Sequence, residues 1–210
     1  PTFDPVFLSA FLDEGWALLQ AGQEAEALEV AKRVVRLQET AESRHFFVEA
    51  VKGWRYFPGA EDFRDVVARA WREAWGAPAD LLGVTLGLLE ANPSVREALG
   101  RATRDWPRRL VLDEIFKGGE LAAFAGDPLI LAVLESDKNV DLGLERLLTS
   151  VRAGLLHVVV SLGAMELPNN TLPLCCALAQ QCFINEYVWG LTDKEAEEVA
   201  ILNDRLTNAL

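Results

Sequence analysis

The two histidines are the first candidates for acid–base chemistry or metal binding, because imidazole titrates near neutral pH and is a frequent metal ligand. His45 and His157 fall in separate predicted helices, and neither has a second histidine or a cysteine at metal-binding spacing. His157 lies within an apolar run, residues 155–160. We interpret it as a core histidine that is partly buried or has satisfied hydrogen bonds. The alternative is a general base or ligand beside an internal pocket.

The three cysteines form a second candidate cluster. Cys175, Cys176 and Cys182 all lie in one predicted helix. Structural zinc sites take ligand pairs about two to four residues apart, usually from two segments, and one helix cannot wrap a tetrahedral ion with this spacing. Cys175 and Cys182 are two turns apart, about 10 Å, which is too far for a disulfide. We therefore predict three free thiols that fill the core, in a reducing cytoplasm.

Motifs for catalysis and cofactor binding are missing from the sequence. It has no phosphate-binding loop, dinucleotide fingerprint or serine elbow. The paired glycines Gly118 and Gly119 follow no predicted strand, so they cannot form a nucleotide-binding turn. We predict no catalytic residue, no metal ligand and no cofactor in this chain.

One local cluster is basic, and it consists of Arg101, Arg104, Arg108, Arg109 and Lys117. Its ordinary interpretation is a solvated face with local ion pairs, which contribute little to stability. The functional alternative is a docking patch for an acidic partner or a phosphate group. The four arginines are therefore candidate partner-binding residues.

Composition narrows the class of protein further. The 210 residues are 50% hydrophobic and 25% charged, as in globular proteins, and the net charge is −12. That charge disfavours binding to nucleic acid or to an anionic membrane. The longest apolar stretch, residues 153–165, is too short to span a bilayer, and the N-terminus lacks the layout of a signal peptide. We expect a cytoplasmic protein.

Apolar residues recur with the period of a helix almost throughout the chain, and turn residues divide it into short helices. Asp4 and Pro5 open the first, and two S/T-x-x-E capping boxes, 94–97 and 192–195, open later ones. The predicted helices cover residues 5–22, 24–37, 41–57, 60–75, 79–91, 94–106, 107–117, 127–136, 141–165, 172–189 and 193–210. Short helices joined by tight turns build an all-α stack or bundle.

The first two predicted helices carry a tetratricopeptide-like pattern. Gly15 and Ala27 occupy its small positions, whereas Glu39 stands where proline is common. We predict degenerate tetratricopeptide-like hairpins over residues 1–125, which pass into an irregular helical bundle, residues 126–210, with a shared core. The alternative is an ordinary helical hairpin.

The segment 175–195 reads CCALAQQCFINEYVWGLTDKE, and residues 127–131 and 140–149 read DPLIL and VDLGLERLLT. Together they resemble the helical region of bacterial tetratricopeptide proteins that carry a class I methyltransferase domain. The resemblance implies a helical module that presents substrate to a cofactor-binding catalytic domain. That domain is not part of this sequence, so we predict that the chain alone does not bind S-adenosylmethionine.

The polar positions that match this family are unusual in an apolar helix. They are Gln180, Gln181, Asn185, Glu186 and Tyr187. One interpretation is a buried hydrogen-bond network that fixes helix packing, and the other is a contact surface for a partner. The last four are candidate partner-binding residues. We expect the helix 172–189 to pack centrally against residues 147–162.

Two hypotheses for function follow from the sequence. The first is a non-catalytic interaction or scaffold module with a protein or peptide partner, which presents substrate to an attached or separate methyltransferase domain. The alternative is a helical small-ligand-binding protein or enzyme with an internal pocket near His157 and the 175–187 helix.

Overall fold

The computed structural model describes residues 5–55, 59–136, 141–163, 167, 170–184 and 190–208. Within these ranges every regular element is a helix, which confirms the predicted all-α class. The chain forms two compact units, Pro1–Leu89 and Glu90–Leu210. The predicted division into tetratricopeptide-like hairpins, residues 1–125, and a helical bundle, residues 126–210, stays a prediction. No described helix has the length and apolar content needed to cross a bilayer.

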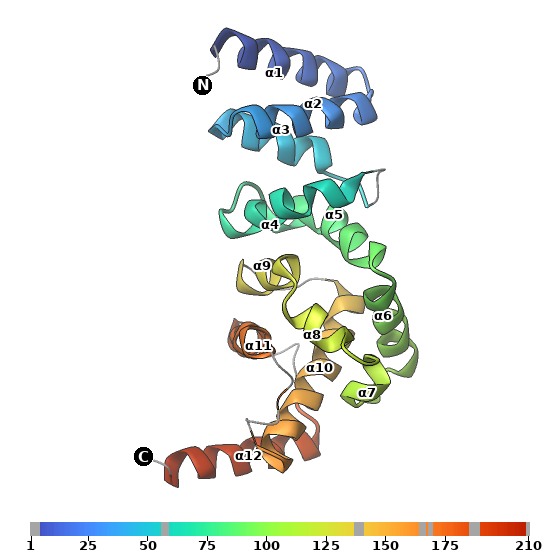
Figure 1. The fold of residues 1–210 in the computed structure, drawn as a ribbon, viewed down its shortest axis with the longest axis vertical. Helices are drawn as coiled ribbons and strands as arrows, with labels where there is room; N and C mark the ends of the chain where they lie inside the picture. The colour runs from blue at the N-terminus through green and yellow to red at the C-terminus, as the bar shows by residue number, and fades with distance from the viewer. Residues whose placement is uncertain are drawn as a thin grey trace. The chain divides into compact units, whose positions relative to one another are not determined.

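Unit 1 begins with three helices that stack as successive layers (Figure 1). They are α1 (Pro5–Gln20), α2 (Glu24–Leu37) and α3 (Ala41–Val51). The 3-10 turn η1 (Ala60–Phe63), α4 (Arg64–Arg72) and α5 (Pro78–Ala91) follow. Trp71 of α4 is buried and donates its indole N–H to Thr85 Oγ1 of α5 at 2.8 Å, so its polar edge is satisfied within the core.

A close approach between α1 and α3 depends on Gly15. A Cβ atom at Gly15 would lie 2.6 Å from Cε1 of Phe46, and closer still to Cζ. Phe46 is fully buried, and Ala27 of α2 is fully buried as well. The two small positions of the repeat pattern are thus places where neighbouring helices meet. The assignment of this hairpin to the tetratricopeptide class stays a prediction.

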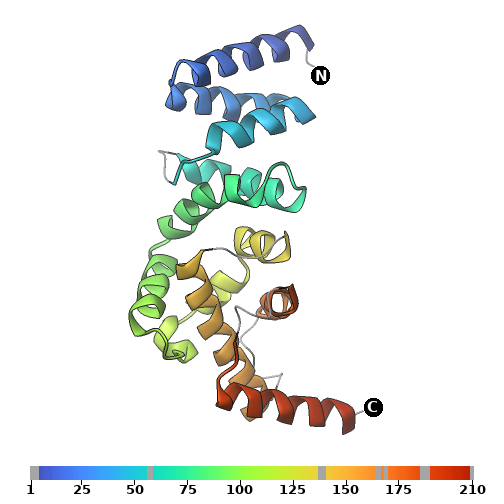
Figure 2. The same ribbon diagram turned by 180° about the vertical axis from the view of Figure 1, so that it is seen from behind.

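Unit 2 is arranged around its longest helix, α10 (Leu142–Ser161). The others are α6 (Pro93–Asp105), α7 (Leu112–Ile115), α8 (Glu120–Ala125), α9 (Pro128–Ser136), α11 (Leu172–Ile184) and α12 (Asp193–Asn208). Figure 2 shows α10 alongside α6, and α10 also packs against α7 and α12. Leu147, Leu148 and Val151 are fully buried on α10. This helix therefore holds the core of the unit.

Several predicted helix boundaries are wrong, and three of them have a clear local explanation or consequence. α3 ends at Val51 instead of residue 57, because Gly53 takes a left-handed conformation with φ of 83°. α6 begins at Pro93, since the Asn92 side chain caps it by accepting from the Ser94 N–H. Residues 106–111 are not helical, so no helix begins at Pro107.

The capping box at 192–195 is confirmed. Thr192 Oγ1 accepts from the Glu195 N–H at 3.2 Å, and a Glu195 carboxylate oxygen accepts from the Thr192 N–H at 2.9 Å. The two reciprocal bonds fix the start of α12. They also fix the direction in which Glu195 enters the unit.

The expected packing of α11 is only partly correct. Its buried residues, among them Leu178 and Gln181, face mainly α9, and α10 is the lesser neighbour. Its other face is open, because the Phe183 side chain is 88% exposed and Leu172 is 68% exposed. The prediction that this helix packs centrally is therefore wrong for its exposed face. Residues 185–189 of the predicted helix lie outside the described residues.

Candidate functional site

Unit 2 contains a cavity of about 530 Å³, open to solvent on one side, between α7, α8, α10 and α12. This is a usual size for a ligand pocket, and such pockets are mostly apolar with a few polar groups. The apolar part of its wall comes from Leu110, Leu112, Phe116, Leu121, Ala122, Ala153, Gly154 and Val158. The cavity lies entirely within one unit.

Short elements on one side of α10 explain why the cavity forms. A Cβ at Gly154 would lie 2.7 Å from Leu112 Cγ, so α7 sits directly on the backbone of α10. However, α7 is a single turn and α8 has six residues. The chain between them passes through Gly118 and Gly119, which line the cavity and have no side chains to fill it.

A buried ion-pair cluster forms the first polar part of the wall. Glu195 is only 3% exposed and pairs with Arg152 of α10, while Arg109 Nε lies 3.8 Å from its second oxygen. Both arginines also donate to the Gly190 carbonyl, at 3.5 and 3.4 Å. The cluster joins the start of α12 to α10 and to the segment before α7.

Electrostatics in this cluster favour the charged carboxylate. Burial acts to raise the pKa of Glu195, but the Thr192 N–H and the Arg152 guanidinium outweigh it, so the pKa lies below its usual value. Burial lowers the pKa of Arg109, with Glu195 opposing that effect and Arg152 adding to it. Glu195 therefore holds two cations in a partly desolvated site.

His157 and Glu198 form the second polar part of the wall. Glu198 Oε1 lies 2.6 Å from His157 Nδ1 and 3.8 Å from Lys194 Nζ. The His157 side chain is 47% exposed. The ring is thus partly buried and has a polar partner, as one interpretation held, but it lies at the cavity wall and not in the packed core.

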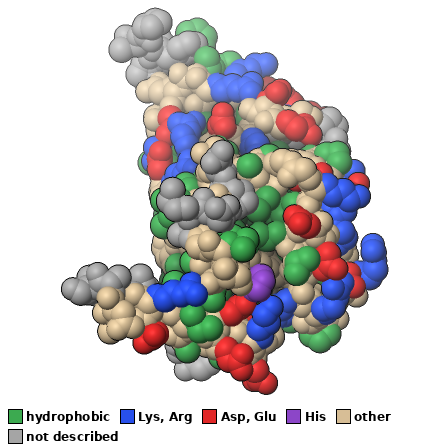
Figure 3. All heavy atoms as spheres, turned by 60° about the horizontal axis from the view of Figure 1, so that its bottom comes forward, with side chains coloured by type: hydrophobic (Ala, Val, Ile, Leu, Met, Phe, Trp, Pro, Cys, Tyr) green, Lys and Arg blue, Asp and Glu red, His purple; other side chains and the backbone are tan. Residues whose placement is uncertain are grey.

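The cavity rim exposes large apolar side chains. Val111 is 55% exposed and Leu162 is 69% exposed, and both line the cavity. In Figure 3, hydrophobic side chains lie among charged ones on the face at the α12 end of the unit. Exposed apolar groups around an apolar hollow are typical of a surface that another molecule covers.

The basic cluster predicted from the sequence is distributed over different contacts. Arg101 donates to the Ile115 carbonyl at 2.8 Å and pairs with Glu97. Arg108 pairs with Glu114 at 3.0 Å, Arg104 is exposed on α6, and Arg109 is the one of the four that lines the cavity. The local ion pairs of the ordinary interpretation are thus present, and the docking patch stays a prediction.

Of the family-like polar residues, Gln180 and Gln181 can be located. Gln180 Nε2 donates to the Glu135 carbonyl of α9 at 3.2 Å. Gln181 contacts the same helix. It is fully buried, and its Nε2 donates to the Leu134 carbonyl of α9 at 2.6 Å. This contact matches the interpretation of a hydrogen bond that fixes helix packing. Asn185, Glu186 and Tyr187 lie outside the described residues.

The three cysteines are free thiols, but they do not fill the core as expected. Cys176 is exposed, and Cys175 and Cys182 are half-buried. Burial raises the pKa of Cys175, which keeps it protonated near neutral pH. Cys182 Sγ accepts a long contact from Arg152 Nη1 at 3.9 Å, so it does face α10. The described residues contain no group of three potential metal ligands.

Glu195 and Glu198 were not predicted from the sequence as residues of the site. They are three residues apart on α12, and this spacing places both carboxylates on the same face of the helix. Their partners Arg152 and His157 both lie on α10. The acidic pair was a visible signal, but its match to α10 depends on tertiary packing.

The described residues form an all-helical fold, and its second unit contains a cavity with a mainly apolar wall. Comparison with protein-family models, curated proteins and solved structures finds no match to this chain.

Proposed function

We propose that this chain is a non-catalytic interaction module whose second unit binds an apolar side chain of a protein partner. The observation that carries the proposal is the apolar cavity with exposed Val111 and Leu162 at its rim. A side chain in the cavity would be the anchor, and the rim would exclude water around it. Protein interfaces commonly concentrate their binding energy in such an anchor.

The charges of the wall indicate which anchor fits. Lys194 and Arg109 contribute two positive charges, and Asp113, Glu195 and Glu198 contribute three negative charges. Arg109, Lys194, Glu195 and Glu198 already pair with one another, or with Arg152 and His157. An anionic anchor would have to break one of these pairs. An uncharged leucine or phenylalanine side chain gains about 1.5–3 kcal/mol from burial without that penalty.

The family resemblance adds a proposal about the partner. The module would hold a substrate protein for an attached or separate methyltransferase domain. This part of the proposal depends on the sequence resemblance in residues 127–195, and the cavity supports only the binding role.

Leu162→Asp is expected to weaken partner binding by at least about tenfold, because it places a charge on the apolar rim. Leu142→Asp is the matched control, since Leu142 is 57% exposed at the other end of the same helix and does not line the cavity. The measurement is a selection of displayed random peptides on the unaltered protein, followed by affinity measurements on both variants. Circular dichroism checks that both variants stay folded.

Selected peptides that share an apolar anchor and lose affinity only for Leu162→Asp support the proposal. Peptides without a shared anchor, or equal affinity for both variants, contradict it. The same peptides can then be searched for in candidate partner proteins.

A second candidate function is the binding of a small molecule, and the His157–Glu198 contact favours it. If Glu198 accepts the Nδ1 proton, Nε2 of the neutral ring is left as an acceptor for a ligand hydroxyl or amide. His157→Gln separates the two candidates. It is expected to leave binding of an apolar peptide anchor within about twofold and to weaken a ligand held at Nε2 by tenfold or more.

A further inference from the structure

Unit 1 has a separate concavity of about 340 Å³ between α2 and η1. It is lined by Glu29, Lys32, Arg33, Arg36, Leu37, Asp62 and Phe63. Its three cations, Lys32, Arg33 and Arg36, all belong to α2, and its aromatic ring, Phe63, belongs to η1. In a protein with a net charge of −12, three cations against two carboxylates make this hollow locally basic.

The three cations are not equivalent. Lys32 is largely buried and pairs with Glu29 at 2.6 Å, so its charge is matched locally. Arg33 and Arg36 are exposed, and no carboxylate among the residues that the structure describes lies within 4.0 Å of their nitrogens. Two arginines that lie three residues apart on α2 and line the same hollow therefore have no anionic partner within the described part of the chain.

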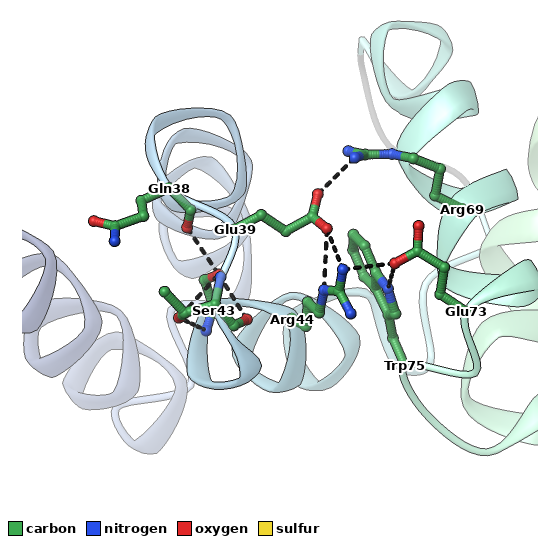
Figure 4. Close-up of polar contacts among 8 residues, drawn as sticks. Gln38, Glu39, Ser43, Arg44, Arg69, Glu73 and Trp75 are labelled. Atoms are coloured by element: carbon green, nitrogen blue, oxygen red, sulfur yellow. Dashed lines mark hydrogen bonds and ion pairs between the residues drawn. The ribbon is translucent and has the colours of Figure 1, made fainter. Parts of the chain in front are cut away.

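Other arginines of unit 1 show the contrast. Arg44 pairs with Glu39 at 2.5 Å and with Glu73 at 2.6 Å, and Arg69 pairs with Glu39 at 2.6 Å (Figure 4). This cluster is closed, because each guanidinium already meets a carboxylate. Arg33 and Arg36 on α2 are instead available to a carboxylate of another molecule.

Aromatic contacts hold the open pair in position. The Arg36 guanidinium lies 4.4 Å from the centre of the buried Phe63 ring and donates to the Asp62 carbonyl at 3.2 Å. The Arg33 guanidinium lies 5.5 Å from the Phe11 ring. Groups held in place lose less entropy when an anion binds, and the planar guanidinium suits a carboxylate.

We propose that this concavity binds the carboxylates of an acidic peptide segment. The negative charges of such a peptide would complement Arg33 and Arg36. Leu37 is 36% exposed at the same hollow and would contact an apolar peptide residue beside the acidic ones. Nucleic acid is a poorer match, because it presents a phosphate at every nucleotide, whereas this hollow offers only Arg33 and Arg36 as open cations. This site is on unit 1 and goes beyond the apolar anchor proposed for unit 2.

The test is fluorescence anisotropy with a labelled peptide of repeated Glu-Glu-Leu units. The double variant Arg33→Gln/Arg36→Gln is expected to bind it at least about tenfold more weakly, because both charge-assisted contacts are lost. Raising the salt concentration is expected to weaken binding to the unaltered protein and to have little effect on the variant. Both residues are exposed, so circular dichroism should report an unchanged fold.

Two matched controls make the result specific. Arg104→Gln removes an exposed arginine of unit 2, and Leu162→Asp alters the rim of the other cavity; both are expected to bind the peptide within about twofold of the unaltered protein. Equal loss in Arg104→Gln would indicate non-specific charge attraction and would overturn the proposal. Displacement by millimolar inorganic phosphate or by a single-stranded oligonucleotide, but not by an unlabelled acidic peptide, would overturn it as well.

Discussion

Glu195→Ala is expected to destabilise unit 2 by about 3–5 kcal/mol, the usual cost of removing one partner from a buried ion pair. The carboxylate is 3% exposed and holds Arg152 and Arg109, which are themselves 11% and 18% exposed. Its removal leaves two adjacent guanidinium groups without their shared anion. It also removes the side-chain acceptor for the Thr192 N–H at the start of α12. Urea denaturation, followed by hydrogen exchange of unit 2 amides, measures the change.

Glu197→Ala is the control for this substitution. Glu197 is exposed two residues further along α12, and alanine favours helix, so a change within about 0.5 kcal/mol is expected. Equal effects of the two substitutions would show that the ion-pair cluster does not hold α12 in place.

The same carboxylate predicts a dependence of stability on pH. The pKa of Glu195 is lower in the folded protein than the ordinary value of 4.5. Its contribution to stability is therefore fully present above that ordinary value, and it is lost as pH falls toward the lowered folded pKa. Glu195→Gln should remove this part of the acid sensitivity. An unchanged stability difference between the two proteins from pH 7 down to pH 3 would contradict the assignment.

Gly15→Ala is expected to destabilise unit 1 by about 1–3 kcal/mol, although alanine favours helix over glycine by about 1 kcal/mol. The new Cβ would lie 2.6 Å from Cε1 of Phe46, which is fully buried and cannot swing into solvent. α1 and α3 would have to move apart. Trp16 also packs on Phe46, with ring centres 5.2 Å apart, so its fluorescence should report the displacement.

Gly100→Ala provides the matched comparison on α6. A Cβ there meets no atom within 4 Å, so the same change should stabilise unit 2 by about 0.5–1 kcal/mol through helix propensity alone. Thermal unfolding of both variants measures the opposite signs. Stabilisation by Gly15→Ala as well would mean that α1 and α3 are not in close contact.

Local signals accounted for most of the helices. The Thr192–Glu195 box starts α12 as the sequence predicted. Asp141 accepts from the Leu144 N–H at 2.8 Å and caps α10, where a helix was predicted from residue 141. Predictions failed where a stronger local competitor was present. The predicted cap of α6 was Ser94, but the Asn92 side chain caps this helix. The Ser94 hydroxyl instead donates to Glu120 at 2.9 Å.

The cavity could not be predicted from the sequence in the same way. His157 lies in an apolar run, yet its side chain is 47% exposed at the cavity wall. There it contacts Glu198, which is 41 residues further along the chain. Glu39 was a departure from the repeat pattern, and its reason is the ion pairs with Arg44 and Arg69. These roles arise from contacts between distant segments, which residue spacing alone does not specify.

The most direct measurement is a methyl NMR titration of the chain with N-acetylphenylalanine methylamide, a mimic of an uncharged anchor residue. We expect saturable shifts at Leu121, Val158 and Leu162 with millimolar affinity, which is reasonable for a ligand of this size. Ala122→Trp, which places an indole in the cavity from α8, should abolish these shifts while the fold is kept. Shifts absent in the unaltered chain, or equal in both proteins, would contradict a binding cavity in unit 2.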